Sequence, residues 1–254
     1  MASDLKGKAV LITGASTGIG AAAARAFARH GCRLAIHYNA SRDAAEQVAA
    51  DVRSLGGEAV LVGGDVTQGA NVKRIVAETL AALGRVDVLI NNAGGLVART
   101  RIEDYTEEFL HKVIALNVIQ VALFMREAIP VMRRQKKGNV INVSSIAARH
   151  GGGAGAIVYA GAKGFISTAT HGWAKEVVGD GIRVNAISPG VITTPFHERY
   201  TTAEQLKAMQ ATVPMNRLGT PDECAGTLLY LASDELSGYV TGQVIEVNGG
   251  QYMP

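Results

Sequence analysis

The glycine-rich stretch at residues 11–20, Leu-Ile-Thr-Gly-Ala-Ser-Thr-Gly-Ile-Gly, is the feature that most constrains the fold. The apolar run Ala9–Ile12, at its start, is short enough for a buried parallel strand. Residues 21–30, which follow it, contain neither Gly nor Pro and indicate a helix. A glycine-rich turn between a strand and a helix lets another group approach the backbone closely. The helix start adds unpaired N–H groups and partial positive charge, which suit a pyrophosphate.

The glycines of this turn are spaced G-x-x-x-G-x-G, which differs from the usual G-x-G-x-x-G dinucleotide fingerprint. Glycine-rich strand-to-helix turns also occur for packing alone, so the turn by itself leaves both interpretations open. The dinucleotide interpretation predicts coenzyme contacts from Gly14, Ser16, Thr17, Gly18, Ile19 and Gly20.

Composition describes a soluble globular chain. The 254 residues are 48% hydrophobic and 19% charged, which fits one α/β domain with a full core spanning residues 1–254. The net charge of +3 is small, and no concentrated basic tail indicates a nucleic-acid partner. No uninterrupted apolar run approaches the length of a membrane span, and the first residues lack an apolar signal core. We therefore expect a cytoplasmic protein without a membrane or nucleic-acid partner.

The two cysteines, Cys32 and Cys224, lie far apart and lack metal-ligand spacing. We expect them to be buried free thiols in a reducing compartment, and we expect no metal site.

Short apolar runs alternate with helical segments along the whole chain. The expected strands are Ala9–Ile12, Arg33–Tyr38, 59–62, 86–90, 140–143, 182–187 and Val244–Val247. The expected helices are 21–30, 43–55, 71–83, 107–134, 157–178 and Pro221–Ala232. This alternation predicts an α/β fold with a doubly wound parallel sheet covered by helices on both faces. Ligands in such sheets bind at the carboxyl ends of the strands.

The end of the second strand bears on the choice of coenzyme. In a dinucleotide fold an acidic residue at this place hydrogen-bonds the ribose hydroxyls and selects NAD. Here Tyr38 and Asn39 are followed by Ser41 and Arg42, and the first acid is Asp43. Asn39 and Ser41 can donate to a 2′-phosphate and Arg42 can supply charge, which favours NADP with NAD possible. If Arg42 merely starts a solvated helix, the preference is weak or dual.

The third and fourth strands end in further candidate coenzyme residues. Asp65 and Val66 follow the third strand, where the Asp65 carboxylate can accept from an adenine amino group or cap the next helix. The fourth strand ends in Asn91-Asn92-Ala93-Gly94-Gly95, where an Asn side chain can tie neighbouring strands together and small residues let a coenzyme lie flat. The alternative is an Asn-Gly turn with no ligand.

Four residues can carry out carbonyl chemistry beside a nicotinamide. Tyr159 and Lys163 lie four apart on one expected helix face, and Ser145 follows the fifth strand. Hydride transfer to a carbonyl needs a proton donor, and a tyrosine whose pKa is lowered from about 10 is suitable. An ammonium at about 4 Å in an effective dielectric near 20 contributes about 4 kcal/mol, on the order of three pKa units.

Ser145 would orient the substrate oxygen, and Asn117 could hold a water that links Lys163 to solvent. Each residue also has an ordinary interpretation. A Tyr-x-x-x-Lys pattern is common on helices, Ser144-Ser145 can be a helix cap, and Asn117 can be a core polar group satisfied by backbone.

The motifs as a set resemble the short-chain dehydrogenase/reductase family over essentially the whole chain. They are Thr13-Gly-x-x-x-Gly-Ile-Gly20, Asn91-Asn-Ala-Gly94, Asn117, Ser145, Tyr159-x-x-x-Lys163 and Pro189-Gly190. The resemblance implies a Rossmann fold, a Ser145–Tyr159–Lys163 triad assisted by Asn117, and a homotetramer. It also implies that Tyr159 and Lys163 lie against the nicotinamide ribose, and that Pro189, Gly190, Ile192 and Thr194 contact the coenzyme.

The chain resembles 3-oxoacyl-[acyl-carrier-protein] reductase-like and sugar- or polyol-dehydrogenase-like members most. The basic residues 133–137 would suit an acidic carrier protein, although a solvated helix end explains them equally well. Residues 95–99 differ from the carrier-protein reductases, and Asp180 stands where many of those enzymes have an arginine. The substrate is therefore an acyl-thioester carbonyl or a small ketone, sugar or polyol.

The region around the catalytic residues leaves further questions open. Residues 193–215 are predicted to form a substrate lid. Arg99, His150 and His197 either line the pocket or lie on the surface. A coenzyme-binding regulator without catalytic activity is the alternative from another class.

Overall fold

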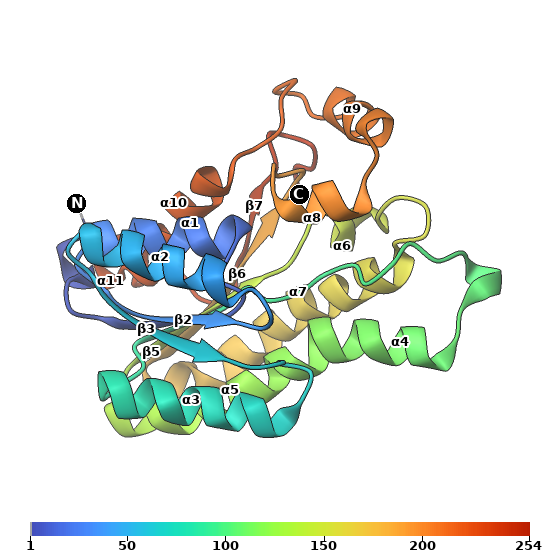
Figure 1. The fold of residues 1–254 in the computed structure, drawn as a ribbon. Coiled ribbons are helices and arrows are strands. Elements are labelled where there is room, and N and C mark those ends of the chain that lie inside the picture. The colour runs from blue at the N-terminus through green and yellow to red at the C-terminus, as the bar shows by residue number, and fades with distance from the viewer. Residues whose placement is uncertain (1) are drawn as a thin grey trace.

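The computed structural model describes residues 2–254 as one α/β unit built on a seven-stranded parallel sheet. The strand order is β3-β2-β1-β4-β5-β6-β7 (Figure 1). The strands are β1 Ala9–Ile12, β2 Arg33–Tyr38, β3 Glu58–Gly63, β4 Val88–Asn91, β5 Gly138–Val143, β6 Ile182–Pro189 and β7 Val244–Val247. The doubly wound α/β prediction is confirmed, and the winding direction reverses between β1 and β4.

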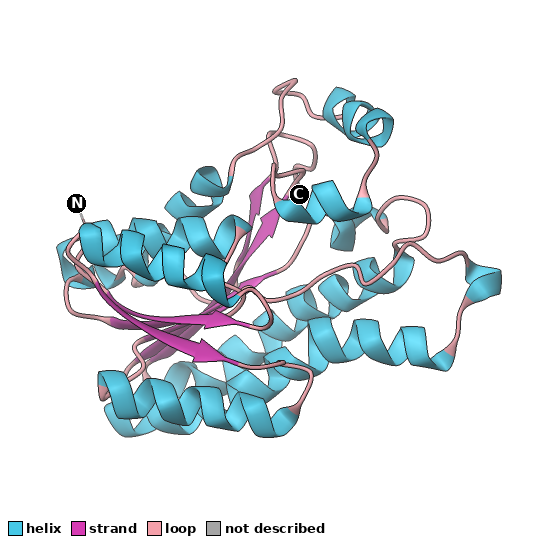
Figure 2. Ribbon diagram, in the orientation of Figure 1, coloured by secondary structure: helices cyan, strands magenta, loops and turns pink. Residues whose placement is uncertain are grey.

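Helices cover both faces of the sheet (Figure 2). One layer contains α1 Gly18–Arg29, α2 Arg42–Ser54 and α10 Pro221–Ala232, and the other contains α3 Gly69–Leu83, α5 Gln120–Gln135 and α7 Ile157–Val177. The remaining α-helices are α4 Glu107–Ile114, α6 Ala147–His150, α8 Pro195–Tyr200, α9 Ala203–Ala211 and α11 Asp234–Ser237. Short 3-10 turns lie at Ser3–Leu5, Ile102–Asp104 and Val178–Asp180.

The first strand shows why continuous apolar runs mark the central strands. Val10 and Ile12 belong to the core under α1, α2 and α10, whereas Ala9 and Leu11 belong to the core under α3, α5 and α7. Alternate side chains point to opposite faces of a strand, and both faces are buried here. Every residue of β1 must therefore be apolar.

The expected helix at 107–134 is interrupted by a π-turn, Ala115–Ile119, between α4 and α5. Asn117 lies in this turn and is fully buried. The whole helix Glu107–Gln135 is long and apolar enough, by length and composition, to cross a membrane. In this fold its residues Phe124 and Met132 pack in the core against the sheet, as expected for a core helix.

The two cysteines are buried and free, as expected. Burial raises the pKa of each thiol to about 12. Within residues 2–254 no group of three or more His, Cys, Asp or Glu side chains could hold a metal ion.

A buried chain of polar side chains fixes α7 on the sheet. Asn91 Nδ2 donates to Asn142 Oδ1 at 2.9 Å, and Asn142 Nδ2 donates to Thr170 Oγ1 at 3.0 Å. Thr170 in turn donates to the carbonyl of Ile166 at 2.8 Å. β4, β5 and α7 are therefore joined through side chains, which confirms that an Asn of the fourth-strand motif ties neighbouring strands together.

Asn142→Ala is expected to lower the free energy of unfolding by about 2–3 kcal/mol, because it leaves buried polar partners on Asn91 and Thr170 unsatisfied. Urea denaturation followed by circular dichroism measures this. Lys73→Ala, on the exposed side of α3, is the control and should change stability by less than about 0.5 kcal/mol. Equal stability of the two variants would contradict the assigned role of Asn142.

Candidate active site

A cavity of about 480 Å³ runs along the carboxyl ends of the strands. It collects residues from the β1–α1 turn, from the ends of β2 to β6 and from α7. The predicted site residues that line it are Gly14, Ser16, Thr17, Gly18, Ile19, Asn39, Ser41, Asp65, Val66, Asn92, Ala93, Gly94, Ser145, Tyr159, Lys163, Pro189, Gly190, Ile192 and Thr194. Three predicted site residues, Gly20, Tyr38 and Asn117, are not among the lining residues.

The β1–α1 turn has the open backbone that an anion requires. Gly14 and Gly18 have φ of +62° and +55°, in the left-handed region. Thr17 is the N-cap of α1 and its side chain makes no capping hydrogen bond. The first N–H groups of α1 are therefore available to a ligand, together with the positive end of the helix dipole.

Gly20 serves packing. A Cβ at this position would lie 2.5 Å from the Gly14 carbonyl oxygen and 2.7 Å from Asn92 Nδ2. The coenzyme contact predicted for Gly20 is therefore replaced by a contact within the turn.

Asn92 and Thr13 hold the same turn against the end of β4. Asn92 Nδ2 donates to the carbonyls of Thr13 and Gly14 at 2.9 and 3.0 Å. The Thr13 hydroxyl accepts from the N–H groups of Asn92 and Ala93, both at 2.9 Å. The polar groups of Asn92 are thus used to shape the turn from which a ligand would be held.

His37 is a site residue that the sequence analysis missed. Its Nδ1 accepts from the Gly14 N–H at 3.0 Å, and its Nε2 lies 2.8 Å from the Gly64 carbonyl. This arrangement requires the neutral ring with hydrogen on Nε2, and burial lowers the His37 pKa accordingly. In the sequence a histidine inside an apolar strand is indistinguishable from a core histidine.

The end of β2 contributes Asn39 and Ser41 to the cavity, while its neighbours are used elsewhere. Tyr38 covers Gly63, where a Cβ would lie 2.7 Å from Tyr38 Cζ. Arg42 is the first residue of α2 and pairs with Glu46 at 2.9 Å, with 69% of its side chain exposed. Arg42 thus starts a solvated helix, which is the alternative under which coenzyme preference is weak or dual.

The Asp65 carboxylate fulfils one of its two predicted roles, that of a cap. Its Oδ1 accepts from the backbone N–H and hydroxyl of Thr67 at 2.9 and 2.8 Å, which caps the turn before α3. It nevertheless lines the cavity, so both roles are compatible with its position.

The other end of the cavity holds the reactive side chains. Lys163 is buried, and its Nζ donates to the Val143 carbonyl at 2.7 Å and lies 5.8 Å from the Tyr159 ring centroid. Ser145 hydrogen-bonds the Tyr159 side chain. Ser144 instead bonds the Lys163 carbonyl at 3.0 Å and Ser167 Oγ at 2.7 Å. Of the two serines, Ser145 is therefore the one directed at the phenol.

The prediction that the Tyr159 pKa is lowered is wrong. Burial raises the pKa of Tyr159 to about 12, and the Ser145 hydrogen bond only partly opposes this. Burial also lowers the pKa of Lys163 to about 8. The physical reason is that Lys163 contacts a carbonyl and does not touch the phenol oxygen, so desolvation exceeds charge attraction.

Asn117 holds the segment after β4. Its Nδ2 donates to the Gly95 and Val113 carbonyls at 2.8 and 2.9 Å, and its Oδ1 accepts from the Gly95 N–H at 3.1 Å. The side chain is therefore satisfied by backbone, as one of its two interpretations required. A Cβ on Gly94 would lie 2.8 Å from Asn117 Oδ1 and 3.2 Å from Lys163 Nζ, so only glycine fits at this point.

All three side chains whose location was open, Arg99, His150 and His197, line the cavity. Arg99 donates through Nε to the Tyr200 carbonyl and through Nη1 to the Ala154 carbonyl, both at 2.9 Å. Further lining residues that the sequence analysis missed include Phe196, Arg199 and Met209. All three lie within residues 193–215, the segment predicted to form a substrate lid, but no local pattern distinguishes these side chains from their neighbours.

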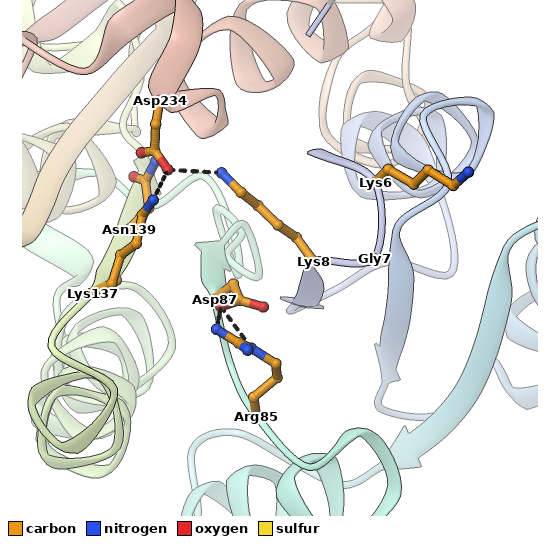
Figure 3. A pocket seen from close by; sticks show the side chains of 9 residues that line it. Lys6, Gly7, Lys8, Arg85, Asp87, Lys137, Asn139 and Asp234 are labelled. Atoms are coloured by element: carbon orange, nitrogen blue, oxygen red, sulfur yellow. Dashed lines mark hydrogen bonds and ion pairs between the residues drawn. The ribbon is translucent and has the colours of Figure 1, made fainter. Parts of the chain in front are cut away.

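A second cavity, of about 200 Å³, lies at the opposite ends of the strands (Figure 3). Asp234 pairs with Lys8 at 3.0 Å and with Lys137 at 2.8 Å, and Asp87 pairs with Arg85 at 2.6 Å. The two pairs of Asp234 join the starts of β1 and β5 to α11, and Asp87 accepts from the Ala9 N–H at 2.9 Å, which joins the starts of β4 and β1. We interpret this cavity as a structural ion-pair cluster.

A dinucleotide-type turn and a Ser-Tyr-Lys group in one cavity of a doubly wound sheet define a nucleotide-dependent oxidoreductase. A family profile described as Enoyl-(Acyl carrier protein) reductase matches residues 14–251. The chain belongs to the short-chain dehydrogenase/reductase family.

Individual relatives match along nearly their whole length. The chain is 37% identical to the 3-oxoacyl-[acyl-carrier-protein] reductase of Synechocystis sp. over 253 residues, which covers 98% of each chain. It is 37% identical to the 3-oxoacyl-[acyl-carrier-protein] reductase of Thermotoga maritima, covering 97% of this chain and 98% of the relative. The solved NADH-dependent reductase A1-R′ responsible for alginate metabolism gives a TM-score of 0.92 at 36% identity, covering 99% of this chain and 100% of the other. Its complex with NAD gives 0.90 at 36% identity, covering 100% of both chains.

Lys163→Met is expected to change how stability depends on pH. The folded protein holds the Lys163 proton less tightly than the unfolded chain, since the pKa falls from 10.5 to about 8. The free energy of unfolding of the wild type should therefore rise relative to that of the variant between about pH 8 and pH 10, by about 2–3 kcal/mol. Urea titrations of both proteins without coenzyme at pH 7, 8, 9 and 10 measure the difference.

Cys32, Cys224 and Tyr159 titrate above pH 8 in both proteins, so their contributions cancel in this comparison. A constant difference between the two proteins across this pH range would show that the Lys163 ammonium is not destabilised by burial.

Proposed function

We propose that this protein transfers a hydride between a nicotinamide coenzyme and a carbonyl or secondary alcohol, with Tyr159 as acid and base. The observation that carries the proposal is that the β1–α1 turn and the Ser145–Tyr159–Lys163 group line the same cavity. A turn with free N–H groups and a segment where only Gly94 fits are what a flat dinucleotide needs.

The residues take the following parts. The turn at 14–19 and Thr194 would hold the pyrophosphate, Asp65 and Val66 the adenine, and Lys163 the nicotinamide ribose. When bound, the nicotinamide supplies or accepts the hydride. Pro189, Gly190 and Ile192, at the end of β6 and just beyond it, would contact the nicotinamide half.

Tyr159 supplies the proton to the substrate oxygen during reduction, and Ser145 orients that oxygen through a hydrogen bond. The raised pKa of the Tyr159 phenol keeps its proton in place at neutral pH, which is the form that a donor needs. Lys163 returns a proton through a water held at the π-turn of Asn117. Because the Asn117 side chain is already satisfied, we assign this water to the turn's backbone.

We propose that both NADPH and NADH are used, with a modest preference for NADPH. The end of β2 has no carboxylate that would repel a 2′-phosphate, and Asn39 and Ser41 can donate to it. The pairing of Arg42 with Glu46 weakens this preference, because the nearest cation is engaged.

Of the two substrate classes, we favour a small carbonyl compound over a carrier-bound acyl thioester. The names of the relatives support the thioester. The basic run at 133–137, however, is partly neutralised, because Arg133 pairs with Asp180 at 2.7 Å and Lys137 pairs with Asp234 at 2.8 Å. Docking of an acidic carrier at this surface would have to compete with these ion pairs.

Residues 193–215 are proposed to close over the substrate. They include α8 and α9, which lie beyond the carboxyl ends of the strands (Figure 1). Phe196, Arg199 and Met209 from this segment line the cavity. We also propose a homotetramer, as the family resemblance implies, which light scattering of the purified protein tests. The composition favours a cytoplasmic location.

Tyr159→Phe is expected to reduce kcat by about 10²- to 10⁴-fold and to retain coenzyme affinity, because only the proton donor is removed. Coenzyme oxidation at 340 nm with a panel of ketones measures turnover, and titration calorimetry measures binding. Tyr230→Phe, on α10 far from the cavity, is the matched control. Wild-type turnover in the Tyr159 variant would exclude this residue as the acid, whereas a wild type that binds coenzyme but reduces no ketone would support the regulator.

Asn39→Asp is expected to raise the ratio of NADH to NADPH efficiency (kcat/KM) about tenfold or more, because a carboxylate repels the 2′-phosphate and accepts from ribose hydroxyls. Asn39→Ala, which removes the amide without adding charge, should change the ratio less. An unchanged ratio in the Asp variant would show that the end of β2 does not contact the ribose.

A further inference from the structure

The part of the cavity near Tyr159 is lined by an excess of basic side chains. Arg99, Arg199, His150 and His197 all line it, in addition to Lys163. The only carboxylate among the lining residues is Asp65, which lies after β3 and next to the proposed adenosine end. The residues come from three separate segments, so the charge is assembled by the fold.

Their contacts place these basic groups on the Tyr159 side. Arg99 bonds the carbonyl of Tyr200 at the end of α8 and that of Ala154 in the loop before α7. The Phe196 ring lies 5.8 Å from the Tyr159 ring and 5.3 Å from the His197 ring, measured between centroids. Arg199 lies on the same short helix, with its guanidinium 5.9 Å from the Tyr200 ring centroid.

Neither arginine is neutralised within the chain. Among residues 2–254 no carboxylate oxygen lies within 4.0 Å of a nitrogen of Arg99 or Arg199, whereas Arg133, Arg149 and Arg217 each have such a partner. The charge of Arg99 also contributes to the lowered pKa of His197, although burial is the larger cause. Two guanidinium groups without carboxylate partners in the lining of a reaction site offer charged donors to an anion.

We propose that the substrate carries an anionic group, a carboxylate or a phosphate, which Arg199 and Arg99 bind while its carbonyl faces Tyr159. This inference rests on the proposed function and defines its substrate class. Arg99 has two of its nitrogens occupied by backbone carbonyls and positions α8 against the loop at 151–155. The Arg199 guanidinium makes no hydrogen bond within residues 2–254, so it is the freer of the two donors.

The test compares matched anionic and neutral carbonyl compounds. The pairs are pyruvate with pyruvamide, 4-oxopentanoate with 4-oxopentanamide, and dihydroxyacetone phosphate with dihydroxyacetone. We expect the wild type to prefer the anion in at least one pair by tenfold or more in kcat/KM. Arg199→Gln should bring that preference to near one, because only the anionic partner loses a charged contact, and Arg199→Lys should restore part of the preference.

Arg101→Gln is the control, because Arg101 is exposed, pairs with Glu103 at 3.4 Å and is not among the lining residues. Ratios near one in every pair, or a ratio that Arg199→Gln leaves unchanged, would overturn the inference while the proposed reductase activity stands. A weakened affinity for NADPH in Arg199→Gln with an unchanged ratio would assign the arginine to the coenzyme phosphates and would also overturn it.

Binding measured without turnover separates this inference from the proposed function. Calorimetric titration of the same pairs into the protein holding NADP⁺ should show tighter binding of the anion in the wild type and equal binding in Arg199→Gln. If no compound is reduced with either coenzyme, the proposed function fails, and the binding ratio alone still decides whether the cavity selects anions.

Discussion

The burial of the Lys163 ammonium against the Val143 carbonyl is the interaction on which the site depends. It joins β5 to α7 and fixes Tyr159, one helical turn away, at the cavity wall. Its cost is visible in the lowered Lys163 pKa, and the fold accommodates it with rigid neighbours. Gly94 must be glycine because Lys163 and Asn117 occupy the space that a side chain would need. The hydrogen-bonded chain from Asn91 through Asn142 to Thr170 also anchors α7 on the sheet.

Side-chain amides and one imidazole fix the conformation of the loops whose backbone groups would face a ligand. Asn92 and His37 hold the β1–α1 turn, and Asn117 holds the segment at Gly95. Each of these polar groups binds backbone, so the motif residues act mainly by fixing the loops. This division of labour explains why the neutral form of His37 matters, since protonation would remove the acceptor of the Gly14 N–H.

Much of this architecture could be predicted from sequence because it follows from local periodicity. Apolar runs of strand length alternating with helices dictate a parallel sheet, and motifs at strand ends must meet at one edge. What could not be predicted depends on distances between remote segments. Gly20 and Tyr38 occupy motif positions but contact Gly14 and Gly63, and Arg199 lines the cavity although nothing distinguishes it from its neighbours in the predicted lid. The raised pKa of Tyr159 could not be predicted, because the spacing of residues along a helix gives no information on desolvation.

The net charge of the chain, only +3, also gives no indication that two arginines without carboxylate partners line the cavity. Many of the other arginines have a carboxylate partner, as Arg149 does with Glu246 at 2.8 Å and Arg217 with Glu223 at 2.6 Å. Two arginines without carboxylate partners in the lining of the cavity that holds the reactive tyrosine create a positive potential there, which would attract an anionic ligand. Because Arg199 lies on α8 and Arg99 bonds the carbonyl at the end of that helix, an anion bound by both would add a further link between the segment proposed to close and the wall of the cavity.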